Sequence, residues 1–265
     1  MMTESATANW PDGPEEPVRP PADTKVRRWL LGLGAGLAVL LAGWLVLATP
    51  PAFYRRVVGL GPDAETLAGR FVTEAAAVVA ATEREGPWGV EMSDRAINAW
   101  LGHDLPRNHP ELLGGSPWGR LSRPRVEFAP KLARIGIEVS TWGVRAVAWA
   151  EVEVSLRTAN QFSILIHRAG LGGLPLPRDA VLRECGKRLA RGGLEAEMHR
   201  FRDRSLLLVT IPERLAKRNS GHAAGPRQPA RRWQIESLRL DQGSLALAGS
   251  SRGVDHRRAA DKAAP

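Results

Sequence analysis

The side chains best placed to bind a metal lie close together in one segment rich in proline and glycine. They are His103, Asp104, His109 and Glu111. Histidine nitrogens and carboxylate oxygens are common ligands of zinc. The two histidines, however, are six residues apart, a spacing that matches no helical zinc motif. We therefore interpret these side chains as exposed polar residues of a loop, and we predict no metal site.

Cys185 is the only cysteine of the chain, so no internal disulfide and no cysteine-based metal site can form. Its neighbours Arg183, Lys187 and Arg188 would lower the pKa of a reactive thiol. Free cysteine is nevertheless among the most buried residue types. We expect Cys185 to pack as a small buried hydrophobic side chain.

Catalytic motifs are absent from the sequence. There is no G-x-S-x-G elbow, no P-loop and no H-E-x-x-H pattern. The glycines near residue 34 lack the spacing and the strand–helix context of a dinucleotide-binding fingerprint. The sequence therefore predicts a protein without enzymatic activity and without a cofactor.

The strongest single feature is an uncharged run from Trp29 to Ala48, with eight Leu, two Val, four Ala, four Gly and two Trp. Twenty helical residues span about 30 Å, the thickness of the hydrocarbon core of a bilayer. Lys25, Arg27 and Arg28 precede the run, and Pro50 follows it. The sequence predicts one transmembrane helix at residues 29–48, which acts as an uncleaved signal anchor.

The orientation of this anchor follows from the basic residues on either side. Four lie before the run and two, Arg55 and Arg56, follow it closely. The excess places the N-terminus in the cytoplasm and the bulk of the chain outside the bacterial inner membrane. A cleaved signal peptide is the alternative, because Val46-Leu47-Ala48 offers a suitable cleavage site.

Gly32 and Gly36 form a GxxxG pair within the run. Small residues at this spacing allow two membrane helices to approach closely and dimerise. The alternative is a helix that is simply rich in glycine. The pair makes a homodimer one of the partners to consider, together with the bilayer and another envelope protein.

The formal net charge is +9, and residues 57–265 hold thirty-one basic and twenty-three acidic residues, net +8. A basic domain beside a membrane is attracted to anionic headgroups. Nucleic-acid binding is the other common meaning of such charge, and the extracytoplasmic location excludes it. The third interpretation is positive charge spread over a solvated surface. The same alternatives apply to a basic set on one expected helix, Arg178, Arg183, Lys187, Arg188 and Arg191.

The remaining elements follow from periodicity. Residues 1–24 and 251–265 are expected to be disordered tails. Apolar residues recur at helical spacing from Ala64 to Val79, then after a capping serine, Ser93, and again from Pro177 to Gly192. Residues 103–124 are expected to be a loop, and residues 216–231 a basic loop.

Alternation with a period of two marks the strands, at residues 134–140, 144–156 and 161–167, followed by hairpins at 194–211 and 233–249. The fold class predicted for residues 60–250 is α+β: a curved antiparallel sheet packed against about three helices.

One parity of the long middle strand carries very small side chains, which leave volume for a helix or for an acyl chain. The candidate binding residues on this apolar face are Val144, Ala146, Ala148, Ala150, Val152, Phe162 and Ile164. Close packing of a helix onto the alanines is the alternative.

The order of elements resembles a type of small bacterial envelope protein. The features that carry the resemblance are the helix at residues 92–101, the Gly-Leu-Pro-Leu-Pro stretch at 173–177, and the pattern Leu238-x-Leu240…Gly243-x-Leu245-x-Leu247. Over residues 90–250 the chain resembles the YpmS-type membrane-anchored proteins, and more distantly the tubular (TULIP-like) lipid-binding domains. The resemblance implies an extracytoplasmic domain that holds lipid in an apolar groove. The alternative function is an envelope scaffold with a solid core, which dimerises through its membrane helix.

Overall fold

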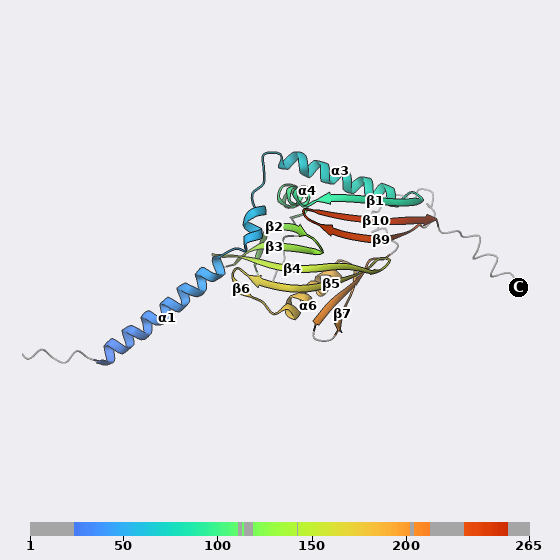
Figure 1. The fold of residues 1–265 in the computed structure, drawn as a ribbon. Coiled ribbons are helices and arrows are strands. Elements are labelled where there is room, and N and C mark those ends of the chain that lie inside the picture. The colour runs from blue at the N-terminus through green and yellow to red at the C-terminus, as the bar shows by residue number, and fades with distance from the viewer. Residues whose placement is uncertain are drawn as a thin grey trace, which may run out of the picture. The chain divides into compact units, whose positions relative to one another are not determined.

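The computed structural model describes residues 24–110, 113, 119–141, 143–201, 204–212 and 231–253 (Figure 1). The tail expected at the N-terminus lies almost entirely outside these residues, as does most of the basic loop expected at residues 216–231. The chain divides into two compact units between Trp44 and Leu45. The unit that begins at Leu45 therefore includes the end of the first helix.

Helix α1 (Thr24–Ala48) covers the uncharged run, and α2 (Ala52–Val57) follows after three residues. Among the described residues, no helix is both long enough and apolar enough to count as a candidate membrane span. The expected helices at residues 64–79 and 177–192 are confirmed as α3 (Ala64–Thr82) and α6 (Arg178–Arg191). Ser93 caps α4 (Asp94–Ala99), since its hydroxyl accepts a hydrogen bond from the Ala96 amide at 3.1 Å.

The expected loop at residues 103–124 is wrong at both ends. A π-helical turn (Trp100–Asp104) and α5 (Leu105–Asn108) extend α4, and strand β2 (Arg120–Ala129) occupies the other end. Strand β1 (Gly86–Ser93) was also not anticipated. Neither strand shows a clean two-residue alternation. A proline interrupts the pattern of both strands, and arginines interrupt that of β2 as well.

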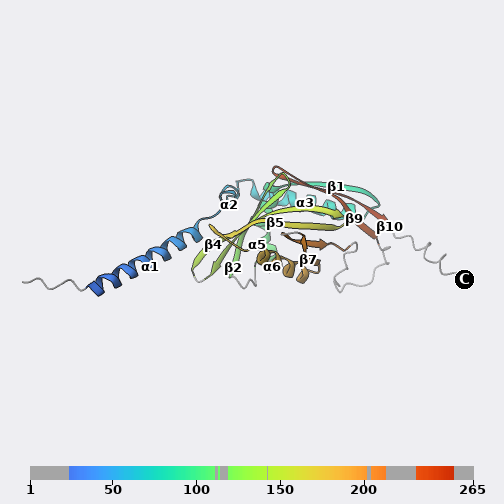
Figure 2. The same ribbon diagram turned by 60° about the horizontal axis from the view of Figure 1, so that its bottom comes forward.

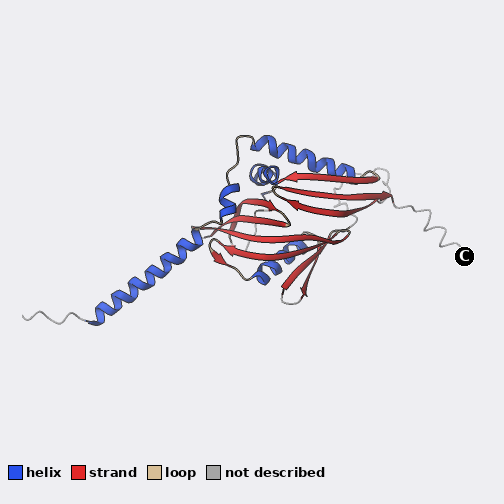
Figure 3. Ribbon diagram, viewed as in Figure 1, coloured by secondary structure: helices blue, strands red, loops and turns tan. Residues whose placement is uncertain are grey.

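The described strands form two antiparallel sheets, not the single sheet predicted (Figure 3). The larger, curved sheet has the order β2-β3-β4-β5-β8-β7, with the short β6 (Leu174–Pro175) also on β5. The smaller sheet has the order β1-β10-β9. The other strands are β3 (Leu132–Thr141), β4 (Val144–Thr158), β5 (Gln161–Leu171), β7 (Glu195–Phe201), β8 (Arg204–Thr210), β9 (Arg231–Asp241) and β10 (Ser244–Gly253).

Strand β10 continues past the expected start of the C-terminal tail, and Ser251 within it is buried. The hairpin of β9 and β10 gains β1 as its third strand, in a register that pairs Val90 with Leu247. Pairing with β1 is why the last hairpin belongs to a separate sheet rather than to the edge of the long one.

The main core lies where the two sheets and α6 meet (Figure 2). Leu182 of α6 and Leu207 of β8 are almost completely buried in it. Trp88 of β1 and Ile235 of β9 join them from the small sheet, and Val152 of β4 joins from the long sheet. Helix α3 runs alongside β1 and α4 (Figure 1), and its Val78 and Ala81 pack against the main core.

Two buried asparagines supply hydrogen bonds at sheet edges. The Asn98 amide of α4 donates to the Val126 carbonyl at 2.6 Å and accepts from the Val126 amide at 2.8 Å. It thereby pairs with β2, an edge strand, as a neighbouring strand would. Asn160, in the turn between β4 and β5, bonds to β9 in the same way through Trp233 and Ile235. These amides join α4 and the small sheet to the long sheet.

We predict that Asn98→Leu lowers the free energy of unfolding by about 2–4 kcal/mol, because it leaves the buried amide and carbonyl of Val126 without partners. Asn108→Leu is the matched control, since Asn108 is exposed and bonds only Asp104; it should change the value by less than about 0.5 kcal/mol. Denaturant titration of the full chain in detergent measures both. Equal effects of the two substitutions would contradict the prediction.

Candidate functional site

The long sheet has two faces of different character. Successive side chains of a strand point to opposite faces. The face that carries Ala148 and Val152 of β4 is named here the apolar face. The opposite face carries Val147 and Trp149, which pack against α2, and is named the α2 face.

The seven predicted binding residues fall into different environments on the apolar face. Val152 and Phe162 are buried in the main core, and Ala150 and Ile164 pack against that core. Ala146 is also buried. Val144 and Ala148 are only half-buried. Strand parity placed the residues together, but core packing covers the part of the face nearest α6 and the small sheet.

The other part of the apolar face holds an uninterrupted row of apolar residues across four strands. Ile137 pairs with Ala148, Ala148 with Leu171, and Leu171 with Leu174. None of the four is buried, and Leu174 is 42% exposed. We name these four residues the apolar row. Beside it, Ile135 is 47% exposed, although its cross-strand partner is Ala150 in the sheet interior.

Sequence reasoning missed three of the four residues of this row. Only Ala148 was among the predicted set. Leu174 belongs to β6, a strand of two residues that leaves no periodic signal. Ile137 lies in the strand predicted at residues 134–140, but its exposure depends on which elements cover β3, and that information is not in the local pattern.

On the α2 face, two aromatic residues fix α2 to the sheet. Phe53 and Tyr54 are almost fully buried and form a small core with Val147. They sit over Gly136 of β3, where an added Cβ would lie 2.7 Å from Tyr54 Cδ2. Glycine at this point of the strand therefore allows the close approach of α2.

The hydroxyl of Tyr54 completes this contact. It donates a hydrogen bond to the Arg123 carbonyl of β2 at 2.8 Å. Burial, assisted by the nearby carboxylate of Glu138, raises the pKa of Tyr54 to about 12. The phenol thus stays neutral and acts as a donor over the whole physiological range.

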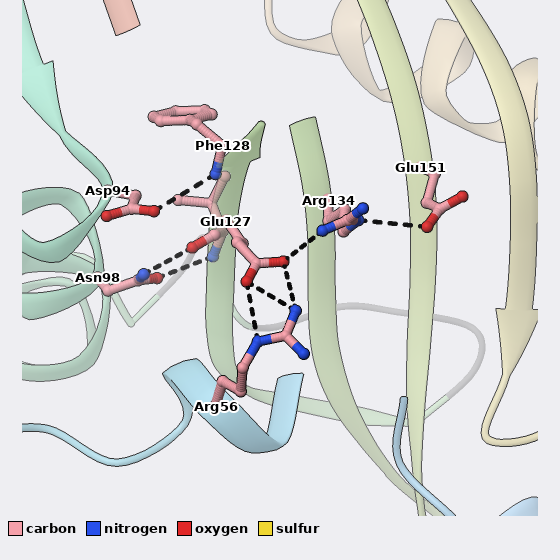
Figure 4. Close-up of polar contacts among 8 residues, drawn as sticks. Arg56, Asp94, Asn98, Glu127, Phe128, Arg134 and Glu151 are labelled. Carbon is pink, nitrogen blue, oxygen red and sulfur yellow. Dashed lines mark hydrogen bonds and ion pairs between the residues drawn. The ribbon is translucent and has the colours of Figure 1, made fainter. Parts of the chain in front are cut away.

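A row of alternating charges lies next to the aromatic contact (Figure 4). Glu127 of β2 accepts hydrogen bonds from Arg56 of α2 at 2.9 Å and from Arg134 of β3 at 2.8 Å. Arg134 also contacts Glu151 of β4 at 3.3 Å. Glu151 in turn pairs across the strands with Arg168 of β5, which lies over the Trp149 ring. The row ties α2 to four strands of the sheet.

The electrostatics of this row follow from partial burial. Burial alone would raise the pKa of Glu127, but hydrogen bonds from Arg134 and Arg56 outweigh it and hold the pKa below the ordinary glutamate value. Arg56 and Arg134 both contact Glu127, and Arg134 also contacts Glu151. The row is therefore suited to holding elements together.

The other chemical candidates do not assemble. Among the described residues, no group of three metal-ligating side chains comes together. Asp104 accepts a hydrogen bond from Asn108, and the ring of His109 lies against Trp100. Glu111 lies outside the described residues. Cys185 is exposed on α6, so its predicted burial is wrong; desolvation still raises the pKa of its thiol, which disfavours the reactive thiolate.

We predict that Tyr54, the only tyrosine of the chain, titrates at about pH 12 in the folded protein and near pH 10 after denaturation. Because the folded-state pKa is the higher one, this contribution to stability is complete below pH 10 and is lost as the pH rises towards 12. Phenolate absorbance in the ultraviolet measures both titrations. A folded-state value near 10 would show that α2 does not cover the ring.

We predict that Glu127→Gln lowers the free energy of unfolding by about 1.5–3 kcal/mol at neutral pH, because Arg56 and Arg134 lose a charged acceptor. The stability that Glu127 provides is present above the ordinary glutamate pKa and is lost as the pH falls through its depressed folded-state value. The variant should therefore show a flatter acid limb than the unmodified chain. Glu74→Gln, which removes an exposed pair with Arg70, should cost less than about 0.5 kcal/mol; similar curves for both variants would refute the role of Glu127.

No protein-family model, curated protein or solved structure matches the chain. The functional argument therefore rests on its own residues. Two features carry it: the apolar row on one face of the long sheet, and the contact of α2 with the other face.

Proposed function

We propose that the chain is a single-pass envelope protein of the bacterial inner membrane, without enzymatic activity, whose α+β domain lies outside the cytoplasm and binds lipid or another amphiphile. The anchor in this proposal is the uncharged run from Trp29 to Ala48. Its support is the composition of the run and the basic residues before it. The large side chains of α1 that are described are also mostly exposed, including Leu33, Leu37, Leu40 and Leu41.

The observation that carries lipid binding is the apolar row. Ile137, Ala148, Leu171 and Leu174 adjoin one another across β3 to β6 without being buried. Monomeric soluble proteins rarely leave contiguous apolar surface uncovered unless it serves an interaction. The row leads to the turn of Gly172 and Gly173, which contacts the last residues of α1. In the proposal, an acyl chain leaves the bilayer at this turn and lies along the row.

Binding would need no covalent chemistry. Burial of acyl surface stabilises a complex by about 25 cal/mol per Å². The small side chain of the half-buried Ala148 would let methylene groups approach the sheet closely. Ile135, half-exposed at the side of the row, adds apolar contact. None of the four cross-strand positions of the row carries a charged side chain.

A scaffold function is the alternative, and a specific observation favours it. Val152 and Phe162, which were predicted to bind the ligand, are buried in a filled core. In this alternative the domain acts through partner proteins. Dimerisation would use Gly32 and Gly36, where an added Cβ would meet no atom within 4 Å.

We predict that a phospholipid with a diazirine in its acyl chain forms photo-adducts with residues 132–150 and 168–175 of the membrane-bound full chain, in addition to residues 29–48. Ile135→Glu should reduce the domain adducts about tenfold, because a carboxylate replaces roughly 1.5 kcal/mol of apolar contact. Peptide mass spectrometry locates the adducts. Adduct formation at residues 29–48 serves as the internal measure of anchoring.

Val79→Glu provides the matched control, because Val79 is an exposed valine on α3, away from the long sheet. It should leave the domain adducts unchanged. Adducts confined to residues 29–48 in the unmodified chain would reject the lipid-binding site and favour the scaffold. Absence of adducts at residues 29–48 would reject the anchor.

A further inference from the structure

The point at which the anchor joins the domain is fixed by a turn of the long sheet. The amide of Gly173 donates a hydrogen bond to the Val46 carbonyl at 2.8 Å. Gly172 has a positive φ of 58°, and a Cβ there would collide with the Leu47 backbone. Both contacts lie within the unit that begins at Leu45. The last turn of α1 is thus part of the folded domain.

The residues that follow α1 contact the opposite face of the long sheet, the α2 face. Only Thr49, Pro50 and Pro51 separate α1 from α2, a distance of at most about 10 Å. Phe53 and Tyr54 then pack on the sheet. The domain therefore has no flexible linker that would let it move away from the end of the uncharged run.

A row of basic residues crosses this end of the sheet. Arg120 of β2 pairs with Ser140 of β3, and Ser140 pairs with Arg145 of β4. Paired residues share a face, so the two arginines project from the α2 face two strands apart, at about 10 Å. Both are exposed, and neither forms an ion pair with a described residue. By contrast, Arg56 and Arg134 both contact the carboxylate of Glu127.

The register places these arginines at the same end as the anchor contact. Ala148 pairs with Leu171, the residue before Gly172. Arg145 lies three residues before Ala148, towards the Gly172–Gly173 turn, at about 10 Å along the strand. Arg55 of α2 is a third exposed arginine. Glu138, the acidic residue in the adjoining cross-strand position, already pairs with Arg123 at 3.6 Å.

We propose that Arg120 and Arg145 form a binding surface for the phosphate groups of anionic phospholipids. This inference rests on the proposed anchor, which brings this end of the sheet to the headgroup layer. Guanidinium groups bind phosphate oxygens in a bidentate manner, and each basic residue near an anionic surface strengthens its attraction. The surface would hold this end of the sheet against the headgroups.

The test uses the full chain in nanodiscs of phosphatidylcholine, with or without phosphatidylglycerol. A spin label at Thr141→Cys, in a Cys185→Ser background, reports on this end of the sheet, since Thr141 is exposed and adjoins Ser140. Collision of the label with a water-soluble nickel complex should fall about twofold or more when phosphatidylglycerol is present. High salt should remove the difference, because it screens exposed charges.

Arg120→Gln with Arg145→Gln should abolish the effect of phosphatidylglycerol, while thermal unfolding stays unchanged because neither side chain forms an ion pair with a described residue. Arg178→Gln with Arg183→Gln removes the same charge from exposed positions on α6 and should preserve the effect. Two results would overturn this inference and leave the anchor standing. The first is a chain that enters the discs but does not respond to phosphatidylglycerol, and the second is an equal loss of that response in both double variants. Chain that fails to enter the discs would overturn the anchor as well.

Discussion

The contact between α2 and the long sheet determines how the rest of the molecule is arranged. Tyr54 and Phe53 lie over Gly136, and Glu127 holds Arg56 on one side and Arg134 on the other. The aromatic part excludes water, and the charged part fixes the orientation of the helix. Because α2 follows α1 after three residues, this contact lies close in sequence to the end of α1.

The two faces of the long sheet consequently have separate roles. The α2 face carries the aromatic rings and the ion pairs of Glu127 that hold α2, together with the exposed Arg120 and Arg145. The apolar face is closed by α6 and the small sheet at Val152 and Phe162, whereas Ile137, Ala148, Leu171 and Leu174 remain at least partly exposed. Asn98 and Asn160 maintain this division, because their amides fix α4 and the small sheet at the edges that they cover. This partly exposed apolar row is the feature from which lipid binding is proposed.

Much of the fold could be predicted from periodicity. Strands β3, β4 and β5 alternate cleanly, and α3, α4 and α6 have clear caps or stripes, so their positions were anticipated. Strands β1 and β2 were not, because Gly86-Pro87 and the arginines of β2 conceal their pattern. Of the predicted binding residues, Ala148 lies in the uncovered row, while Val152 and Phe162 are in the core. Strand parity identifies a face, but only the tertiary structure shows which part of that face is covered. The pairs Arg120–Ser140 and Ser140–Arg145 likewise depend on strand register, and residue spacing alone does not determine the register.

Residues 45–57 belong to the folded domain, because Val46 and Leu47 contact the Gly172–Gly173 turn and α2 packs on the long sheet. Hydrogen–deuterium exchange of the full chain in nanodiscs tests this central claim most directly, because exchange reports local opening of individual segments. The account predicts that the amides of α2 and of Gly173 exchange as slowly as those in the centre of β4 and β5. Rapid exchange throughout residues 45–57, together with slow exchange in β4 and β5, would show a flexible linker and would contradict the account.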